Sequence, residues 1–298
     1  MLQIAIVGFG NVGKSAYEAV LSAPDMELRC IVEAPGTPAA PHLRGCWVSD
    51  LKDICAHGPV DAALLCLPSR LCPDAAETLL RMGICTVDAY DIHGDIWGVK
   101  CRLEATAGQS GAVAVIAAGW DPGTDSLLRG LMEAMAPQGI TYTDFGPGMS
   151  MGHSVAAKAV PGVENALSMT IPAGAGTHRR MVYVQLKPGA SIEAVTQDIK
   201  ADPYFSHDET HVKQVDDVMA LLDMGHGVHM ARKGVSGSTH NQNMEFSMRI
   251  NNPALTSQVM VSAARAAVKQ PAGCYTMIEI PVIDLLPGKK EALVKSLV

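Results

Sequence analysis

The chain has 298 residues, of which 48% are hydrophobic and 18% are charged, and its formal net charge is −7. These values are typical of a soluble globular enzyme of one or two domains, and a negative charge without any basic run argues against a nucleic-acid-binding surface. No apolar stretch is long enough to span a membrane, and the N-terminus runs directly into a strand, so we expect no signal peptide and a cytoplasmic location.

The first predicted element is a strand that breaks into a glycine-rich turn. Residues 3–13 read QIAIVGFGNVG, a buried-strand run followed by three spaced glycines and the start of an amphipathic helix. A dinucleotide pyrophosphate needs this order, because the glycines allow a tight turn and a close approach at the positive end of the helix. The pattern predicts a cofactor-binding loop made of Gly8, Gly10, Asn11, Val12 and Gly13. The alternative is an ordinary glycine turn between a strand and a helix.

The first 118 residues alternate strand and helix patterns. Predicted strands cover 3–7, 28–32, 61–67, 84–88 and 113–118, and predicted helices cover 11–22, 73–82 and 95–109. Continuous apolar strands separated by helices indicate a parallel sheet that is covered on both faces. We therefore predict an α/β fold with a Rossmann-type, doubly wound parallel sheet, whose ligands bind beyond the carboxyl ends of the strands.

After residue 140 the pattern changes to the period-two alternation of strands with one wet face. It is clearest at 181–186 and 243–250, and it is followed by a predicted helix over 253–268, an apolar strand over 274–283 and a closing helix over 288–298. We predict a second, α+β domain for substrate binding and dimerisation at 119–269. The dinucleotide-binding domain is then 1–118, completed by about 270–298.

Carboxylates follow two predicted strands of the first domain. The strand over 84–88 leads to Asp91 and Asp95, and the strand over 113–118 leads to Trp120 and Asp121. Because both ends open on the ligand crevice, we expect Asp91 and Asp121 to converge, where carboxylates suit a substrate ammonium group or a water to be deprotonated. The alternative for the aspartates is helix capping, and Trp120 is either a wall of the site or part of the core.

Further polar candidates lie in the second region. The loop FGPGMSMGH at 145–153 is rich in glycine and ends in His153, which is either an acid–base group or a hydrogen-bonded loop histidine. An arginine fork with neutral donors would bind a carboxylate, and such groups are Thr170, Arg180, His226 and Asn252. Spacing alone does not bring these four together, so solvated surface or local turns are the alternative.

The cysteines and histidines do not form a metal-binding pattern. Seven of the eight cysteines fall in the first 101 residues, yet no C-x-x-C pair occurs, and Cys30, Cys66 and Cys85 lie in apolar runs. The ten histidines have no metal-ligand spacing. We expect reduced, structural cysteines and no metal.

Taken together, several stretches resemble one family, the meso-diaminopimelate D-dehydrogenases. They are GFGNVG, VDAYDIHGDI, AAGWDPGTDS, FGPGMSMGHS, PGVENALSMTIP, HNQNMEFSMRINNPALTSQVM and CYTMIEIP. The resemblance covers nearly the whole chain. It implies NADP-linked reversible oxidative deamination of meso-2,6-diaminopimelate at its D-centre, giving L-2-amino-6-oxopimelate and ammonia, in lysine and cell-wall precursor metabolism. Some members are broader D-amino acid dehydrogenases that reductively aminate 2-keto acids.

The resemblance also implies roles for individual residues. Asp91 and Asp121, with Trp120 and the less certain Asp95, match residues around the reacting D-centre. The loop that lines the substrate is matched by Phe145, Met151 and Gly152, and the group that holds the distal L-centre by Thr170, Arg180, His226 and Asn252. Family members form homodimers through the second region, so the resemblance implies a homodimer here.

The chain departs from the family at two places. The segment 172–180 is short where some members carry a long insertion, which resembles the compact, broader-specificity branch and leaves Arg179 and Arg180 as competing substrate ligands. At the end of the second strand, many members have a basic pair for the 2′-phosphate of NADP, whereas this chain reads Val32-Glu33-Ala34-Pro35.

Glu33 bears directly on the choice of cofactor. It lies 20 residues after Gly13, where an acid accepts hydrogen bonds from the free ribose hydroxyls of NAD. A carboxylate repels a phosphate, so the local chemistry favours NAD while the family favours NADP, with Arg44 and Arg70 as alternative phosphate ligands. The other predicted cofactor contacts are Ala34, Leu67, Pro68, Ser69, Arg70 and Asp91.

The expected chemistry is hydride transfer from the α-carbon to the nicotinamide, followed by attack of water on the imine. Asp91 or Asp121, with His153 as a further candidate, orients or deprotonates the water and the amine, while Arg180 fixes the far end of the substrate. One rival is another dehydrogenase of similar fold, such as a dihydrodipicolinate-reductase-like or aspartate-semialdehyde-type enzyme; the latter needs a cysteine in the substrate loops, and none occurs there. A second rival is a dinucleotide sensor without catalysis.

Overall fold

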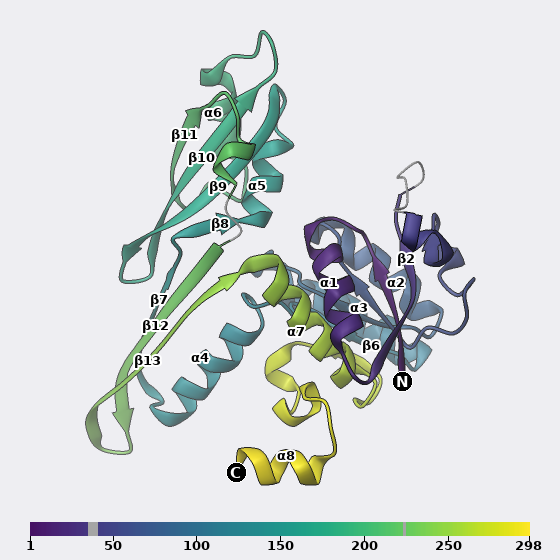
Figure 1. Ribbon diagram of the computed structural model, residues 1–298. Helices are drawn as coiled ribbons and strands as arrows, with labels where there is room; N and C mark the ends of the chain where they lie inside the picture. The colour runs from purple at the N-terminus through teal and green to yellow at the C-terminus, as the bar shows by residue number, and fades with distance from the viewer. Residues whose placement is uncertain (35–40, 223–224) are drawn as a thin grey trace. The chain divides into compact units, whose positions relative to one another are not determined.

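The computed structural model describes residues 1–34, 41–222 and 225–298 (Figure 1). The chain divides into two compact units, the first made of Met1–Leu128 and Pro253–Val298 and the second of Arg129–Asn252. Among the described residues, no helix is both long and apolar enough to cross a membrane.

The first unit is built on a seven-stranded sheet in the order β14-β6-β5-β4-β1-β2-β3, with every neighbouring pair parallel. Its strands are β1 (Leu2–Val7), β2 (Met26–Val32), β3 (Trp47–Val48), β4 (Ala62–Leu65), β5 (Cys85–Asp88), β6 (Val113–Val115) and β14 (Gly273–Tyr275). The reversal of strand order beside β1 is the topological switch of a doubly wound fold. The predicted fold class is thereby confirmed.

Helices cover both faces of this sheet (Figure 1). They are α1 (Asn11–Ser22), α2 (Cys72–Arg81), α3 (Ile96–Ser110) and α7 (Asn252–Ala267). The terminal helix α8 (Lys290–Leu297) has no buried residue and does not cover the sheet. Because side chains alternate along a strand, Ile4 and Ile6 of β1 pack into one core with α1 and α7, while Ala5 and Val7 pack into the other with α2 and α3. Short 3-10 turns lie at Pro41–Cys46, Leu51–Asp53, Ser69–Leu71, His93–Asp95, Met277–Glu279 and Val282–Leu285.

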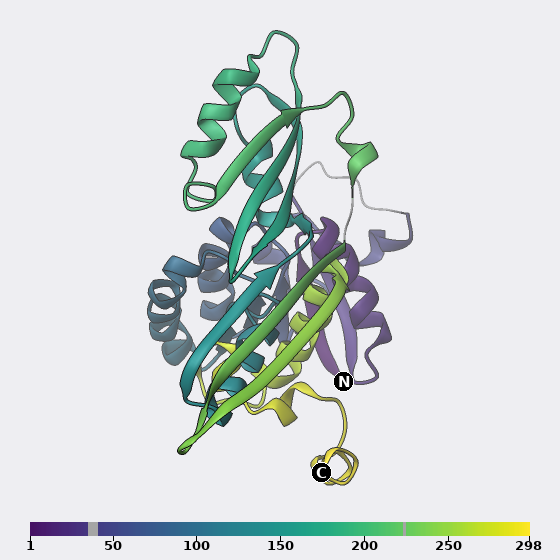
Figure 2. The same cartoon turned by 90° about the vertical axis from the view of Figure 1, so that its left-hand side faces the viewer.

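The second unit contains two smaller sheets, ordered β11-β10-β9-β8 and β13-β12-β7. Their strands are β7 (Gln138–Phe145), β8 (Gly148–Ser150), β9 (Val163–Gly174), β10 (Thr177–Leu186), β11 (Glu209–Gln214), β12 (Gly225–Ser236) and β13 (Thr239–Asn251). The pairs are antiparallel except β10 with β11, and Figure 2 shows the long β12 and β13 side by side. Helices α5 (Met151–Lys158) and α6 (Ile192–Ala201) and a 3-10 turn at Met219–Leu221 complete the unit, and α4 (Thr124–Met135) begins in the first unit and ends in the second.

The strand predicted over 274–283 is wrong beyond Tyr275. Thr276 caps the next 3-10 turn, since its N–H and its hydroxyl both lie within hydrogen-bond distance of the Glu279 carboxylate (2.8 and 2.9 Å). Pro281 then cannot donate to a sheet ladder, so the apolar run folds as two turns instead of a strand.

The compact units also differ in extent from the predicted domains. Helix α7, predicted to lie in the second domain, belongs to the first unit because Val259, Met260 and Ala263 are buried in the same core as β1. Residues 119–128 belong to the first unit as well. The roles assigned to the two domains stay predictions.

Candidate active site

The three glycines after β1 meet different surroundings. Gly8 has φ +90°, and a Cβ there would lie 2.5 Å from the Cys66 carbonyl oxygen; a Cβ on Gly13 would lie 2.1 Å from the Gly8 carbonyl oxygen. A Cβ on Gly10 would meet no atom within 4 Å. The fold therefore leaves no room for a side chain at Gly8 or Gly13. Gly10 instead borders open space at the start of α1, as a pyrophosphate site requires. Asn11 and Val12 form the first turn of that helix.

Glu33 follows β2 and faces the glycine loop. Its Oε2 accepts the Phe9 N–H at 2.6 Å, and its Oε1 accepts the Ala34 N–H at 2.8 Å. The carboxylate is thus held at the position where an acid accepts hydrogen bonds from the ribose of a dinucleotide. Arg44 is exposed on a 3-10 turn, and Pro35 lies outside the described residues.

The loops after β4 and β5 are joined by a side-chain contact. The Ser69 hydroxyl lies 2.6 Å from Asp91 Oδ1, and the Asp91 N–H donates to the same hydroxyl at 3.2 Å. Leu67 and Pro68 directly precede Ser69, and their carbonyl oxygens accept the Cys72 thiol at 3.6 and 3.7 Å. Arg70 is exposed beside them.

Asp88, the last residue of β5, ties together the loops that carry the predicted carboxylates. It is 1% exposed, and its Oδ1 accepts the N–H groups of Tyr90 (2.9 Å) and Ala117 (3.2 Å). Its carbonyl oxygen also accepts the Ala118 N–H at 2.7 Å. Asp88 lies in the stretch VDAYDIHGDI but was not predicted as a site residue; its position as the final residue of a buried strand was the available signal.

The remaining first-unit candidates lie on the same loops. Asp95 precedes α3, and its carboxylate accepts the Tyr90 hydroxyl at 3.1 Å. Trp120 is buried after β6, and Asp121 follows it in the turn that leads into α4. The structure therefore places Asp91 and Asp121 after neighbouring strands, β5 and β6, as predicted from the alternation of elements.

In the second unit, antiparallel pairing brings Thr170 of β9 opposite Arg180 of β10. The guanidinium donates to the Thr170 hydroxyl and, through Nε, to Asp208 Oδ2 at 2.6 Å. Two of the five guanidinium N–H groups of Arg180 thus donate to protein groups, and these two bonds fix the plane of the guanidinium. Arg179 points elsewhere and pairs with Glu209 at 2.8 Å. Asp208 was missed by sequence reasoning, because it lies in a polar turn without a motif.

Two histidines lie near Arg180. Burial, with a smaller effect of the Arg180 charge, lowers the pKa of His178 and of His226. The Phe145 N–H donates to His178 Nε2 at 2.8 Å, which requires that nitrogen to be unprotonated. His178 was also missed, although its spacing of two from Arg180 on a strand puts both side chains on one face. The structure thus groups Thr170, Arg180 and His226, which spacing alone did not.

The stretch 145–153, predicted as a loop, folds instead as the end of β7, the short strand β8 and the first turn of α5. Gly148 approaches β12 so closely that a Cβ would lie 2.4 Å from the Gly225 carbonyl oxygen. Asn252 Nδ2 lies 3.5 Å from the Met149 carbonyl oxygen, the limit of a hydrogen bond. Met151 and Gly152 form the first turn of α5.

His153, on the same turn, has contacts of a structural kind. Its Nδ1 lies 2.8 Å from the Ser150 hydroxyl, and its ring meets Tyr204 and Phe205 edge-on, with centroids 5.3 and 5.2 Å away. These contacts account for its position without catalysis, and its acid–base role stays a prediction.

The eight cysteines are free thiols. Burial raises the pKa of Cys30, Cys66 and Cys274 to about 12, so these thiols are unreactive at neutral pH. Within the described ranges, no cluster of three or more His, Cys, Asp or Glu side chains is suited to a metal ion.

Comparison with known proteins decides the family. The chain is 56% identical over 297 residues to the meso-diaminopimelate D-dehydrogenase of Bacteroides fragilis, covering 100% of this chain and 99% of that protein. The chain belongs to the meso-diaminopimelate D-dehydrogenase family. A second member, from Corynebacterium glutamicum, is 31% identical over 98% of both chains. Residues 119–177 match the diaminopimelic acid dehydrogenase C-terminal domain.

Solved structures agree with membership of the diaminopimelate dehydrogenase family. The C. glutamicum DAP dehydrogenase in complex with DAP has a TM-score of 0.90 and 29% identity, covering 100% of this chain and 99% of that one. An engineered D-amino acid dehydrogenase bound to NADP+ has a TM-score of 0.91, also at 29% identity, with the same coverage. A dihydrodipicolinate reductase is 13% identical with a TM-score of 0.51, a likeness of fold alone.

Proposed function

We propose that the chain catalyses the nicotinamide-dinucleotide-linked, reversible oxidative deamination of meso-2,6-diaminopimelate at its D-centre. The products are L-2-amino-6-oxopimelate and ammonia, and the reverse direction aminates 2-keto acids to D-amino acids. The observation that carries the proposal is the pair Asp91 and Asp121, placed after adjacent strands of a dinucleotide-binding sheet in a full-length member of this family.

The glycine loop and Glu33 would hold the cofactor, which when bound supplies a hydride acceptor for the D-centre. Asp91 and Asp121 would orient the ammonium group and take its proton or that of the attacking water. Carboxylates suit both tasks, because they attract the substrate cation and are ordinarily ionised at neutral pH. Trp120 would exclude bulk water from the same region.

The second unit would bind the distal L-centre. Arg180 presents a cationic fork to a carboxylate, and its partners Asp208 and Thr170 hold that fork in one plane. His226, kept neutral by burial, adds a polar group without adding a second charge. Fixing the L-centre selects which of the two α-carbons reacts.

A direct assay tests this function. The purified protein should reduce a nicotinamide cofactor with meso-diaminopimelate, and Asp91→Ala should retain cofactor binding while losing about two or more orders of magnitude in kcat. Failure to turn over meso-diaminopimelate, D-amino acids or 2-keto acids would favour the sensor or another reductase. Full turnover in Asp91→Ala would remove Asp91 from the mechanism.

For the cofactor, we propose that NAD is preferred to NADP. The support is the Glu33 carboxylate, which would repel a 2′-phosphate and accept ribose hydroxyls. Glu33→Gln should raise the ratio of kcat/KM for NADP to that for NAD by about tenfold, because it removes the repelling charge. Glu27→Gln, on the same strand, is the control. A wild-type preference for NADP would contradict the proposal.

For the substrate range, we propose meso-diaminopimelate as the main substrate, with slower turnover of simple D-amino acids. The β9–β10 hairpin turns tightly at Gly174–Thr177, and relatives at 31–33% identity align over 322–330 residues, against 298 here. The B. fragilis relative aligns over 297 residues, 99% of its length, so its chain is about as short as this one. That relative is named a meso-diaminopimelate D-dehydrogenase. A kcat/KM series over D-amino acids tests this range.

For assembly and place of action, we propose a homodimer formed through the second unit, acting in the cytoplasm in lysine and cell-wall precursor metabolism. The support is the family resemblance together with an exposed apolar face on β7, where Ile140 is 57% exposed and Tyr142 is 42% exposed.

A further inference from the structure

The contact between Ser69 and Asp91 has a defined direction. The Asp91 N–H can only donate, so the Ser69 oxygen accepts it at 3.2 Å. An ionised carboxylate can only accept, so the Ser69 proton lies in the 2.6 Å contact with Asp91 Oδ1. That distance is typical of a charge-assisted O–H···O⁻ bond, which is stronger than a bond between neutral groups.

Ser69 is itself held by the chain around it. Pro68 before it has φ −53°, as its ring requires, and the Leu71 N–H closes the following turn onto the Pro68 carbonyl oxygen at 2.8 Å. Asp91 lies two residues before the 3-10 turn at His93–Asp95, in the loop that follows β5. The fixed turn after β4 therefore anchors a carboxylate carried by the loop after β5.

We infer that Ser69 is a positioning residue for Asp91: its hydroxyl orients the carboxylate that handles the amine and water at the D-centre. This inference rests on the proposed function. It assigns to the Ser69 side chain a task different from the cofactor contact that the sequence pattern predicts. The assignment implies that the hydroxyl acts on turnover, not on dinucleotide affinity.

Ser69→Ala and Ser69→Thr separate the two tasks. With meso-diaminopimelate, Ser69→Ala should lower kcat by about tenfold or more, the worth of a hydrogen bond to a charged group. The dissociation constants of NADH and NADPH, read from nicotinamide fluorescence, should stay within about twofold, since an unmoved backbone keeps the cofactor contacts. Ser69→Thr retains the hydroxyl and should recover most of kcat. Ser296→Ala, which removes an exposed hydroxyl on α8, is the control.

A double-mutant cycle links the effect to Asp91. In an Asp91→Ala background, Ser69→Ala should cause no further loss of kcat, because the group that it positions is absent. If Ser69→Ala weakens NADH and NADPH binding and leaves kcat unchanged, Ser69 is a cofactor contact and the inference is overturned. Should Ser69→Ala unfold, Ser69→Cys replaces the hydroxyl with a weaker donor and should lower kcat while NADH and NADPH binding stays unchanged.

The failures of the inference and of the proposed function are distinguishable. An inactive Asp91→Ala with a fully active Ser69→Ala overturns only the positioning role of Ser69. A fully active Asp91→Ala removes Asp91 from the mechanism and overturns the positioning role of Ser69, but it leaves the proposed reaction standing. Only a wild-type protein without turnover of meso-diaminopimelate, D-amino acids or 2-keto acids overturns the proposed function.

Discussion

The buried carboxyl of Asp88 makes the stability of the fold depend on pH. Burial raises the pKa of its carboxyl to about 6, and the N–H groups of Tyr90 and Ala117 offset only part of that shift. Because the folded pKa lies above the ordinary value of about 4, the folded state binds this proton more tightly than the unfolded chain. The resulting stabilisation is complete below about pH 4 and is lost as the pH rises toward 6.

Asp88→Asn should therefore change the pH dependence of unfolding. The variant keeps an acceptor for the two N–H groups but does not titrate, so its stability relative to wild type should rise by about 1–1.5 kcal/mol between pH 5 and 7.5. Urea unfolding at both pH values measures this difference. Asp53→Asn, on an exposed turn, controls for the lost charge. A stability difference that does not vary with pH would contradict the assignment.

At the scale of elements, the strand–turn–helix unit around the glycine loop contains one glycine that folding requires and another that cofactor binding requires. Gly13→Ala should be severely destabilising, because its Cβ would lie 2.1 Å from the Gly8 carbonyl oxygen and α1 would have to move away from β1. Gly10→Ala should fold normally, because its Cβ meets no protein atom within 4 Å, yet it should weaken dinucleotide binding by about tenfold or more.

Thermal unfolding and cofactor titration of the two glycine variants provide the measurement. Gly130→Ala, in α4 and with no atom within 4 Å of its Cβ, is the control. Tight cofactor binding by Gly10→Ala would show that the pyrophosphate does not approach this residue.

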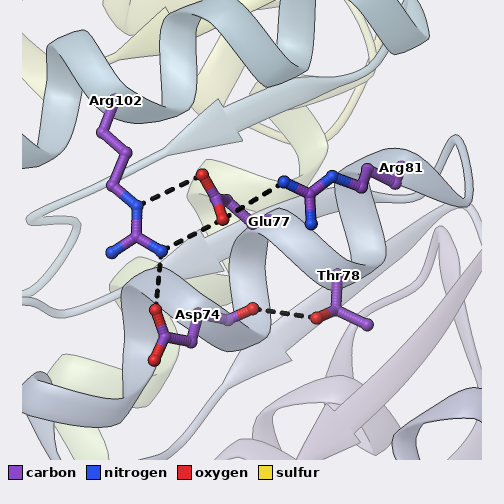
Figure 3. Close-up of polar contacts among 5 residues, drawn as sticks. All are labelled: Asp74, Glu77, Thr78, Arg81 and Arg102. Atoms are coloured by element: carbon purple, nitrogen blue, oxygen red, sulfur yellow. Dashed lines mark hydrogen bonds and ion pairs between the residues drawn. The ribbon is translucent and has the colours of Figure 1, made fainter.

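Helices α2 and α3 are joined by an ion-pair cluster centred on Arg102 (Figure 3). Its guanidinium reaches Glu77 at 3.0 and 3.2 Å and Asp74 at 2.6 Å, while Arg81 reaches Glu77 at 3.4 Å. The Thr78 hydroxyl donates instead to the Asp74 carbonyl oxygen within α2, at 3.0 Å. The hydrogen bond from Arg102 is the main cause of the lowered pKa of Glu77. Because the folded pKa is lowered, the ionised Glu77 stabilises the fold, and this stabilisation is lost as the pH falls through the folded pKa.

Arg102→Met should lower the free energy of unfolding by about 0.5–1 kcal/mol at low salt and by less in 0.5 M salt, because the partners are partly exposed and screened. Arg81→Met is the matched control and should cost less, since Arg81 is more exposed and has one distant contact. Denaturant unfolding at both salt concentrations compares them, and an equal cost for the two variants would count against the role of Arg102 in joining the helices.

For the whole molecule, the proposed dimer predicts a measurable change in assembly. Ile140→Lys should raise the dimer dissociation constant by about tenfold or more, because it places a charge in an apolar contact. Sedimentation velocity across a concentration series provides the test. Ile278→Lys, at a comparably exposed isoleucine of the first unit, is the control. A wild-type protein that is monomeric at all concentrations would contradict the proposal.

The sequence by itself determined the local features of this protein. Strand and helix periodicity, glycine spacing and the 20-residue interval to Glu33 depend on neighbours along the chain, so the parallel sheet, the dinucleotide loop and the aspartates beyond β5 and β6 could all be predicted. The extent of the last strand could not, because Thr276 and Pro281 override an apolar pattern.

Only the tertiary structure decided which distant side chains meet. Strand pairing placed Arg180 opposite Thr170, the turn at 202–208 supplied Asp208, and packing of α7 on the first sheet set the extent of the two units. The links from Ser69 to Asp91 and from Asp88 to Ala117 likewise cross from one strand end to the next. Such contacts depend on strand order and register, which long-range packing selects and local sequence patterns do not record.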